Sequence, residues 1–515
     1  MLYFQTFSFD YVYFDDADYV IENPGVMGGL TIDGIRWAFT SFYMSNWHPL
    51  TWLSHMLDVS LFGPAPGWAH LHNAGLHLIN SLLVYALLLK LSGSWIKACI
   101  LSLVFLAHPL HVESVAWIAE RKDLLCALFF LLGLLRYDSY RAQKSAINYL
   151  SVLLCFVLAL LAKPMAVTFP VVLVLLDIFV YRENIQKNST GYTAFIFRAL
   201  VEKIPFILLS GISSVVTILA QNAGDAVASL KNHTITARLE TVSSAYITYI
   251  KQFLAPVKLV IFYPVSTSFS LGNLFITTAI LLSVVLLPFT VRKRLPLVTL
   301  GFCIFLVTLL PVIGLVQVGS QAHADRYMYI PSVGLLIACV YLLPERHEKH
   351  FQFTTLLAAL FVLFLTLLCF WQVSYWRNEH TLFSRAQEVS GPNYLSHLHL
   401  AQFYTRHSKF DDASQHSLQA MTLDSERPEA YQALGNIALA QQNFPLAEKF
   451  YTESLEKASA EAWMVNNLGI IWAERGEIER GIAAFEKALE MDPSLHAAQQ
   501  NIERYRTKRP KLIPQ

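Results

Sequence analysis

Hydrophobic runs separated by short polar segments dominate the chain between about residue 70 and residue 375. A run of about 20 apolar residues can cross the hydrocarbon core of a bilayer as one helix, and shorter runs need neighbours or a cavity to shield their ends. The pattern predicts ten spans, with boundaries placed to within a few residues. They are 71–91, 96–110, 124–137, 149–162, 165–181, 197–220, 274–291, 297–318, 327–343 and 354–373.

The segment before these runs, from about residue 10 to residue 70, is mixed in polarity and contains many aromatic, proline and glycine residues. It predicts a long loop with two short amphipathic helices, at 32–39 and 50–57, whose Trp and Tyr content suits the lipid headgroup region. Residues 1–5 are interpreted either as a protease-site remnant or as the tail of a preceding helix.

After Trp376 the sequence becomes polar and repeats itself every 34 residues: Leu400-Ala401 recurs as Leu434-Gly435 and Leu468-Gly469. This period predicts three tetratricopeptide repeats, at about 394–427, 428–461 and 462–495, followed by a capping helix at 495–506. Such repeats stack into a solenoid whose concave face holds a peptide. The expected fold is therefore all-α, with a multi-span domain over 1–376 and a repeat domain over 377–515.

Composition agrees with a membrane protein, because 55% of the residues are hydrophobic, only 15% are charged and the mean hydropathy is +0.43. Soluble domains usually carry about a quarter charged residues. The formal net charge of +1 provides no basic field, so no nucleic-acid partner is expected.

Basic residues in alternate loops predict the orientation, since cytoplasmic loops carry an excess of Lys and Arg. The other loops, including the first loop, 108–123, 162–164, 221–271, 317–326 and the C-terminal region, then face outward, and we interpret 246–263 as an interfacial helix. Lys122 is an exception to this pattern. For the first loop to lie outside, either one more helix precedes it or the chain starts outside. The basic residues are Arg136, Arg141, Lys144, Arg182, Lys187, Arg198, Arg292, Lys293, Arg294, Arg346 and Lys349.

The first loop contains the adjacent carboxylates Asp15 and Asp16. Neighbouring carboxylates repel each other, so one tends to have a raised pKa or to be fixed by a cation or hydrogen bond, which suits a general base. An Asp-Asp pair is also common in solvated turns, so the motif alone is not decisive.

Charged and polar groups among spans are costly and are therefore candidate functional groups. His108, His111 and Glu113 could bind a metal ion, but their spacing does not complete a metal site, and we favour hydrogen bonding. The run 120–123, Glu-Arg-Lys-Asp, is either functional or a solvated helix end. Lys163 must lie near the outer surface and could extend to it, and Asp177 fits a helix-end group.

The segment 317–327 ends one span and begins the next. Arg326 could hold a phosphate through two parallel hydrogen bonds, with His323 as a second donor. Alternatively, Asp325 pairs with Arg326 or caps a helix. Together, the Asp15-Asp16 pair, Lys163 and Arg326 would provide a base and cations for an anionic group presented from the bilayer.

Several motifs in the same order resemble one known family. They are Phe14-Asp15-Asp16, the segment 46–52 with His48, 108–117 with Glu113, 120–123, 162–165 with Lys163, and 324–327 with Arg326, followed by the repeats. The chain resembles the transmembrane and tetratricopeptide-repeat glycosyltransferases of the GT-C superfamily, which are related to the membrane protein O-mannosyltransferases. Having three repeats instead of a long array favours a prokaryotic relative.

The resemblance implies transfer of a sugar, with inversion, from a polyprenyl phosphate donor to an acceptor outside the cytoplasm, such as a Ser or Thr hydroxyl of a protein held by the repeats. Asp15 would be the base and Asp16 would orient it. No cofactor is required, and a divalent metal is possible. The expected location is a bacterial or archaeal cell membrane, or the endoplasmic reticulum of a eukaryote. Arg326, Lys163 and His323 would bind the phosphate, with His48, His108, His111, Glu113, Glu120, Arg121 and Asp325 supporting the pocket.

Two other functions are weighed against this one. A transporter or assembly scaffold would use the repeats to recruit a partner, but it predicts paired broken helices, and the spans show no such internal symmetry. A metal-dependent hydrolase built on His108, His111 and Glu113 needs a His-Glu-x-x-His pattern or an equivalent, which the sequence lacks.

Overall fold

The computed structural model describes residues 2–181, 192–223, 235–264, 271–314, 321–345, 350–458, 461–493 and 495–507. These residues are mostly helical, with one short antiparallel strand pair, β1 (Tyr263–Pro264) and β2 (Gln321–His323). The chain divides into two compact units, Met1–Asn378 and Glu379–Gln515.

The first loop contains short helices at the positions that the sequence predicts. The helix predicted at 32–39 is α2 (Ile32–Thr40), and the one at 50–57 is α3 (Pro49–Phe62). Between them and the N-terminus lie η1 (Phe4–Ser8), η2 (Ala17–Ile21) and α1 (Pro24–Met27), and η3 (Tyr43–Ser45) precedes α3. Tyr3 is buried and its ring lies 5.4 Å from that of His77 on α4. Within the segment interpreted as a protease-site remnant or the tail of a helix, Tyr3 therefore packs in the core of this unit.

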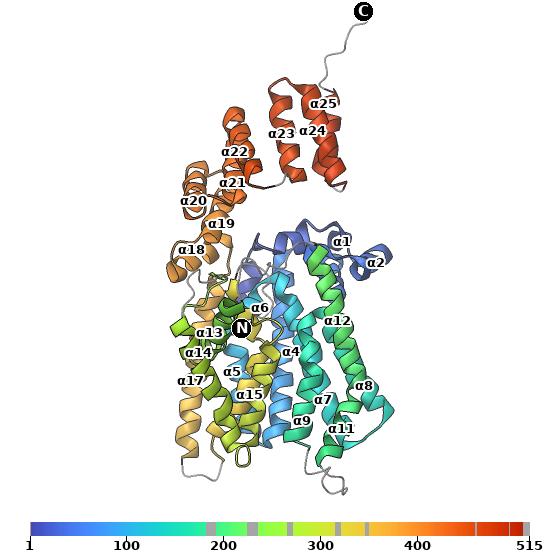
Figure 1. Ribbon diagram of the computed structural model, residues 1–515, viewed down its shortest axis with the longest axis vertical. Helices are drawn as coiled ribbons and strands as arrows, with labels where there is room; N and C mark the ends of the chain where they lie inside the picture. Colours follow the sequence, from blue (N-terminus) through green and yellow to red (C-terminus); the bar gives the residue numbers. More distant parts are fainter. Residues whose placement is uncertain are drawn as a thin grey trace, which may run out of the picture. The chain divides into compact units, whose positions relative to one another are not determined.

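The rest of the first unit is a helical bundle, in which most of the long helices run roughly side by side, with α1 and α2 at one end and α11 at the other (Figure 1). Its elements are α4 (Pro66–Ser92), α5 (Trp95–Ala107), η4 (Pro109–His111), α6 (Val112–Ala116), η5 (Ile118–Glu120), α7 (Arg121–Ala142), α8 (Ala146–Ala162), η6 (Pro164–Thr168), α9 (Phe169–Phe179), α11 (Tyr192–Glu202), α12 (Ile204–Ala223), α13 (Ile235–Leu254), α14 (Leu271–Val291), α15 (Pro296–Leu309), η7 (Asp325–Met328), α16 (Pro331–Ala338), η8 (Cys339–Leu342) and α17 (Phe351–Ser374).

Each predicted span contains helix, but not all of these helices are long enough to cross a bilayer alone. In the described residues, four helices pass by length and apolarity, within α4, α12, α14 and α17, and a fifth is obtained if the bent pair Trp95–Ala107 and Pro109–Ala116 is one span. The others are shorter, and the predicted span 197–220 is divided at Lys203 between α11 and α12. The structure thus supports a multi-pass membrane unit with four or five such spans instead of ten.

Two prolines end helices at the same end of the bundle. Pro109 lies two residues after the end of α5, at a bend of 51°. Pro164 lies two residues after the end of α8, directly after Lys163. Proline cannot donate a backbone hydrogen bond, and its ring disfavours helical geometry in the residue before it. Because both breaks lie where α7 begins, short irregular segments carrying polar residues meet there.

The opposite end of the bundle has its own charged groups. Since α7 has 22 residues, its last turn lies about 30 Å from its first. There Asp177 is fully buried and accepts from Lys203 at 2.6 Å, and Arg141 pairs with it at 2.9 Å. Asp177 thus lies in the last turn of α9, as a helix-end group should, and there it is a buried centre of ion pairs.

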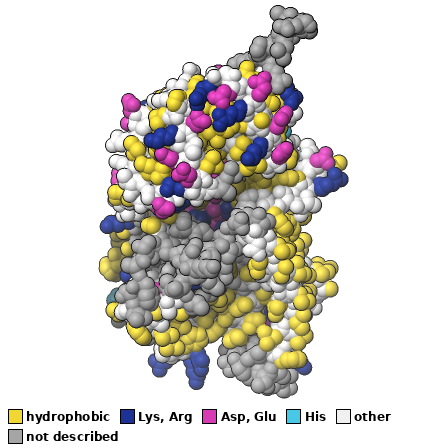
Figure 2. Space-filling model, turned by 45° about the horizontal axis from the view of Figure 1, so that its top comes forward, with side chains coloured by type: hydrophobic (Ala, Val, Ile, Leu, Met, Phe, Trp, Pro, Cys, Tyr) yellow, Lys and Arg dark blue, Asp and Glu magenta, His cyan; other side chains and the backbone are white. Residues whose placement is uncertain are grey.

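Figure 2 shows Lys and Arg side chains at the lower end of the first unit, below a largely hydrophobic surface. Of the residues used to predict orientation, Arg182, Lys187, Arg346 and Lys349 lie outside the described residues.

The second unit begins with α18 (Glu379–Ser390) and continues with three helix pairs whose members pack against each other. Their starts at residues 394, 428 and 462 reproduce the 34-residue sequence period. A Cβ at Gly469 would lie 2.6 Å from the Phe485 ring, which explains why glycine occupies that position. The helices are α19 (Tyr394–Arg406), α20 (Phe410–Leu423), α21 (Pro428–Ala440), α22 (Phe444–Lys457), α23 (Ala462–Glu474), α24 (Ile478–Met491) and a last helix, α25 (His496–Thr507).

Candidate active site

Asp16 is a fully buried carboxylate that connects the first loop to the segment before α7. One oxygen, Oδ1, accepts from the backbone N–H of Ala119 at 2.8 Å, and Oδ2 accepts from that of Val12 at 3.0 Å. Burial raises the pKa of Asp16 to about 7, against the effect of these two hydrogen bonds. Both carboxylate oxygens of Asp16 thus accept hydrogen bonds from the backbone, and these bonds position the first loop against the segment before α7.

Asp15, its neighbour, is only partly buried, and no hydrogen bond from another described residue reaches its carboxylate. Burial raises the pKa of Asp15, Lys122 and Arg326 oppose this shift, and Glu120 adds to it. The ring of Phe14 stacks on Trp117, with centroids 5.4 Å apart, which fixes the loop beside the cations. Asp15 is therefore the carboxylate of the pair that is available to a substrate.

The run Glu120-Arg121-Lys122-Asp123 is buried throughout, with 0–8% of each residue exposed. The interpretation as a solvated helix end is therefore wrong. Arg121 donates to Asn73 Oδ1 at 2.7 Å and to the Ala69 carbonyl at 3.0 Å. Its other partners are Asp58, at 2.5 Å, and Ser54. Through these contacts of its guanidinium group, Arg121 at the start of α7 is bound to α3 and α4, so its task is structural support of the site.

Glu120 lies at the centre of three cations that come from separate parts of the chain. Lys122 and Lys163 each lie 3.2 Å from its carboxylate oxygens, and the Arg326 Nε atom lies 3.3 Å away. Burial would raise the pKa of Glu120, but the three cations outweigh it and hold this pKa well below the usual range. The structure thus brings together Lys163 and Arg326, which the sequence proposed as a pair.

Each of these cations also has a second partner. Lys163 Nζ donates to Asp123 Oδ1 at 2.7 Å, so it does not extend to the surface as the alternative interpretation required. Lys122 Nζ donates to the hydroxyl of Tyr19 at 3.1 Å and lies 4.5 Å from the centre of its ring.

Arg326 pairs with Glu113 and not with Asp325. Its guanidinium donates to Glu113 Oε1, and its backbone N–H donates to Oε2 at 2.9 Å. Asp325 instead accepts from the hydroxyl of Tyr263 at 2.9 Å and from Gln252 at 3.3 Å. The suggested Asp325–Arg326 ion pair is therefore wrong.

Two of the candidate histidines are satisfied by hydrogen bonds. His108 Nε2 contacts the Phe253 carbonyl at 3.0 Å, and His111 contacts the Phe105 carbonyl at 2.7 Å and Ser332 Oγ at 3.0 Å. These contacts agree with the hydrogen-bonding interpretation that the sequence favoured. Among the described residues, no group of three His, Cys, Asp or Glu side chains is arranged to hold a metal ion.

The other two histidines lie in different surroundings. His48 is buried, and burial, together with Lys122 and Lys163, lowers its pKa well below the usual value, so it is neutral beside the cations. His323 stacks on Tyr263 with ring centroids 4.0 Å apart, and burial lowers its pKa to about 4. A neutral imidazole still offers one N–H donor. The Nε2 atom of His323 has no hydrogen-bond partner in the described part of the chain.

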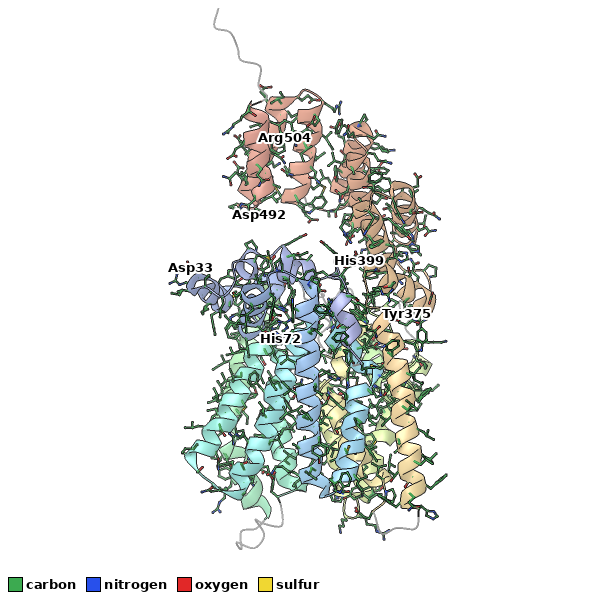
Figure 3. All side chains as sticks on the ribbon, turned by 180° about the vertical axis from the view of Figure 1, so that it is seen from behind. Asp33, His72, Tyr375, His399, Asp492 and Arg504 are labelled. Carbon is green, nitrogen blue, oxygen red and sulfur yellow. The ribbon has the colours of Figure 1, made fainter. Side chains whose placement is uncertain are left out.

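Sequence reasoning assigned no individual role to three residues that the structure places in this cluster: Tyr19, Lys122 and Asp123. One signal was present, because Lys122 is the exception to the positive-inside pattern. A Lys that contradicts topology is accounted for when it is buried with carboxylates instead of lying in a loop. Asp58, the partner of Arg121, also forms a hydrogen bond of 2.7 Å between its Oδ1 atom and His72 Nδ1, towards the loop end of α4 (Figure 3).

No family model matches the chain, but several known proteins are similar to it in sequence. Protein O-mannosyl-transferase Tmtc1 of Drosophila melanogaster is 28% identical over 200 residues, which cover 37% of this chain and 23% of that protein. Protein O-mannosyl-transferase F38B6.6 of Caenorhabditis elegans is 24% identical over 432 residues, 80% of this chain and 59% of that protein. Protein O-mannosyl-transferase TMTC1 of Homo sapiens is 29% identical over 199 residues, 34% of this chain and 22% of that protein.

The chain thus matches between 22% and 59% of the length of these three relatives. The similarity supports a relationship to proteins of that name, and the apolar helices support a multi-pass membrane protein.

Proposed function

We propose that this protein is a membrane glycosyltransferase that moves a sugar from a polyprenyl phosphate donor to a hydroxyl group of a protein. The relatives are named protein O-mannosyl-transferases, which favours mannose as the sugar and Ser or Thr as the acceptor. The observation that carries the proposal is the carboxylate of Asp15, which has no hydrogen-bond partner among the described residues and lies near Lys122 and Arg326. Lys163 belongs to the same cluster of cations around Glu120. A base next to cations is the arrangement that transfer from a phosphate requires.

In the proposed reaction, Asp15 accepts the proton of the acceptor hydroxyl as its oxygen attacks the anomeric carbon. The bond between that carbon and the phosphate oxygen breaks, and the polyprenyl phosphate leaves with the electron pair. Lys163 and Arg326 stabilise the charge that develops on this phosphate, and His323 is a candidate neutral donor. A single displacement of this kind inverts the anomeric centre, as in GT-C enzymes, and needs no cofactor.

Asp16 has a different task in this proposal. Because it accepts two backbone hydrogen bonds, it keeps Asp15 in place and takes no proton from the acceptor. Glu113, Arg121 and Asp325 support the pocket through the contacts described above, and His48 is buried close to Lys122 and Lys163.

The second unit is proposed to hold the acceptor. Its helix pairs repeat with the 34-residue period of tetratricopeptide repeats, whose concave face suits an extended peptide. The orientation predicted from basic loops would place this unit and the first loop on the extracytoplasmic side of a prokaryotic cell membrane, or of the endoplasmic reticulum in a eukaryote.

Replacing Asp15 with Asn tests the proposal directly. We expect Asp15→Asn to abolish transfer of a radiolabelled sugar from a lipid-linked donor while the thermal unfolding temperature stays unchanged, because the side chain bonds to no described residue. Full turnover in Asp15→Asn, with loss of turnover in a folded Asp16→Asn, would move the base to Asp16. Full turnover in both variants would exclude this mechanism.

A further inference from the structure

Three cations that converge on one carboxylate make an oxyanion site, and Glu120 fills it. The contacts come from α7, from the residue before η6, and from η7: Lys122 Nζ and Lys163 Nζ at 3.2 Å, and Arg326 Nε at 3.3 Å. Elements distant in sequence are needed to assemble them. A phosphate oxygen requires the same kind of donors as a carboxylate oxygen.

The contacts to Glu120 are looser than the other contacts of the same cations. Charge-assisted hydrogen bonds are usually about 2.7–2.9 Å long. Lys163 reaches Asp123 at 2.7 Å, and Arg326 holds Glu113 through both its side chain and its backbone N–H. Glu120 can therefore leave at a lower cost than either of these carboxylates, while the cations stay fixed by their other partners.

Counting charges shows why an incoming phosphate needs compensation. Five carboxylates, on Asp15, Asp16, Glu113, Glu120 and Asp123, surround the three cations, since Arg121 is already paired with Asp58. Apart from Asp15, these carboxylates are almost completely buried, with at most 3% exposed. Because burial already raises the pKa of Asp15 and Asp16, this site resists further negative charge, and adding a phosphate is costly unless one negative charge is neutralised.

We propose that Glu120 occupies the position of the donor phosphate in the free protein, and that phosphate binding displaces Glu120 together with the uptake of one proton. This inference rests on the proposed function, because it assigns the phosphate of that donor to this position. Once displaced, Glu120 loses the cations that keep it ionised, and burial then favours its protonated form. Nearby groups that share this field are Lys122, Lys163, Arg326, Asp15, Asp16, Glu113, Asp123, Tyr19 and His48.

The experiment measures binding of methyl farnesyl phosphate, a diester whose single charge is constant between about pH 6 and about pH 8, to the full chain in lipid nanodiscs. If binding takes up one proton, the affinity falls by up to about tenfold for each unit by which the pH rises. Calorimetry of the same binding in two buffers of different ionisation enthalpy counts the protons taken up, and this readout requires no variant.

Glu120→Gln is the matched variant, since Gln carries no charge and needs no proton to leave the cations. We expect it to bind the diester at least about tenfold more tightly than the natural chain at about pH 8, with little dependence on pH. Asp138→Asn is the control, because Asp138 pairs with Lys90 at the other end of α7, and it should keep the natural affinity and pH dependence.

The outcomes separate the two proposals. Binding that is independent of pH in the natural chain, with no proton uptake, would overturn the inference and leave the proposed donor class standing. No binding of the diester by the natural chain or by either variant at any pH would overturn the polyprenyl phosphate donor itself. If Glu120→Gln does not fold, the absence of proton uptake by the natural chain still overturns the inference.

Discussion

At the scale of single residues, the two neighbouring carboxylates of the first loop differ because of what their oxygens contact. Asp16 is buried and accepts from two backbone N–H groups, whereas Asp15 has no such partner in the described structure and faces Lys122. The sequence shows only that the two are adjacent. Their different tasks follow from which one the turn directs inward.

Activity should therefore depend on pH through Asp15. A base must be ionised, and burial raises its pKa above the usual 3.8, so kcat/KM should rise with pH along a limb displaced upward from that value. Lys122 favours the ionised form, so Lys122→Met should move this limb to still higher pH. Lys90 lies on α4 and pairs with Asp138 at the far end of α7, so Lys90→Met should leave the limb in place. A pH profile of kcat/KM for the three proteins checks this, and a limb that moves down in Lys122→Met would contradict it.

Much of the candidate site could be predicted at this scale, but its pairing could not. The carboxylate motif was identified because adjacent carboxylates repel each other, and Lys163 and Arg326 because polar groups among apolar runs are costly. The partner of Arg326 is Glu113, 213 positions earlier, and no local pattern contains that information. The local guess, Asp325, failed because the chain turns its carboxylate towards Tyr263 instead.

At the scale of elements, the helices were predictable because their apolar runs are long, and their ends were predictable where proline follows. The count of complete spans was not, since the sequence does not show where a run is interrupted. The predicted span 197–220 is divided at Lys203, whose ammonium is fully buried against Asp177. A charged residue inside an apolar run can thus be buried by a partner on another helix.

Close packing of two helices depends on a pair of glycines. Gly301 on α15 faces Gly334 on α16, and a Cβ at Gly301 would collide with the backbone oxygen of Gly334. Gly301→Ala should force the helices apart and lower the thermal unfolding temperature by several degrees, which corresponds to a loss of about 1–3 kcal/mol from overpacking.

Gly211→Ala on α12 is the matched control. A Cβ there meets nothing within 4 Å, so the change should be neutral or slightly stabilising through helix propensity. Thermal unfolding monitored by tryptophan fluorescence compares the two variants. Equal stability of both would mean that the backbones of α15 and α16 separate without cost.

At the scale of the whole molecule, two compact units have different surfaces and different repeat patterns. The first carries the apolar helices and the buried charge cluster, and the second consists of helix pairs with a 34-residue period. The period could be read directly from the sequence because each pair repeats the same small residues where two helices touch. What the repeats bind cannot be read this way, since binding depends on exposed side chains that the period leaves free to vary.

Removal of residues 379–515 tests the division of labour between the units. Cutting after Asn378 keeps Trp376, which is buried in the first unit with its ring 5.8 Å from Trp117 beside the candidate site. If the second unit holds only the acceptor, the shortened protein should bind the lipid-linked donor with unchanged affinity, because all donor-binding candidates lie in the first unit. Transfer to a protein acceptor should fall by at least about tenfold, mainly through a higher KM for the acceptor, since the lost contacts contribute to its binding. Donor binding by calorimetry and transfer kinetics with varied acceptor concentration measure the two effects separately. An equal loss of donor binding and acceptor use would show instead that the second unit stabilises the first.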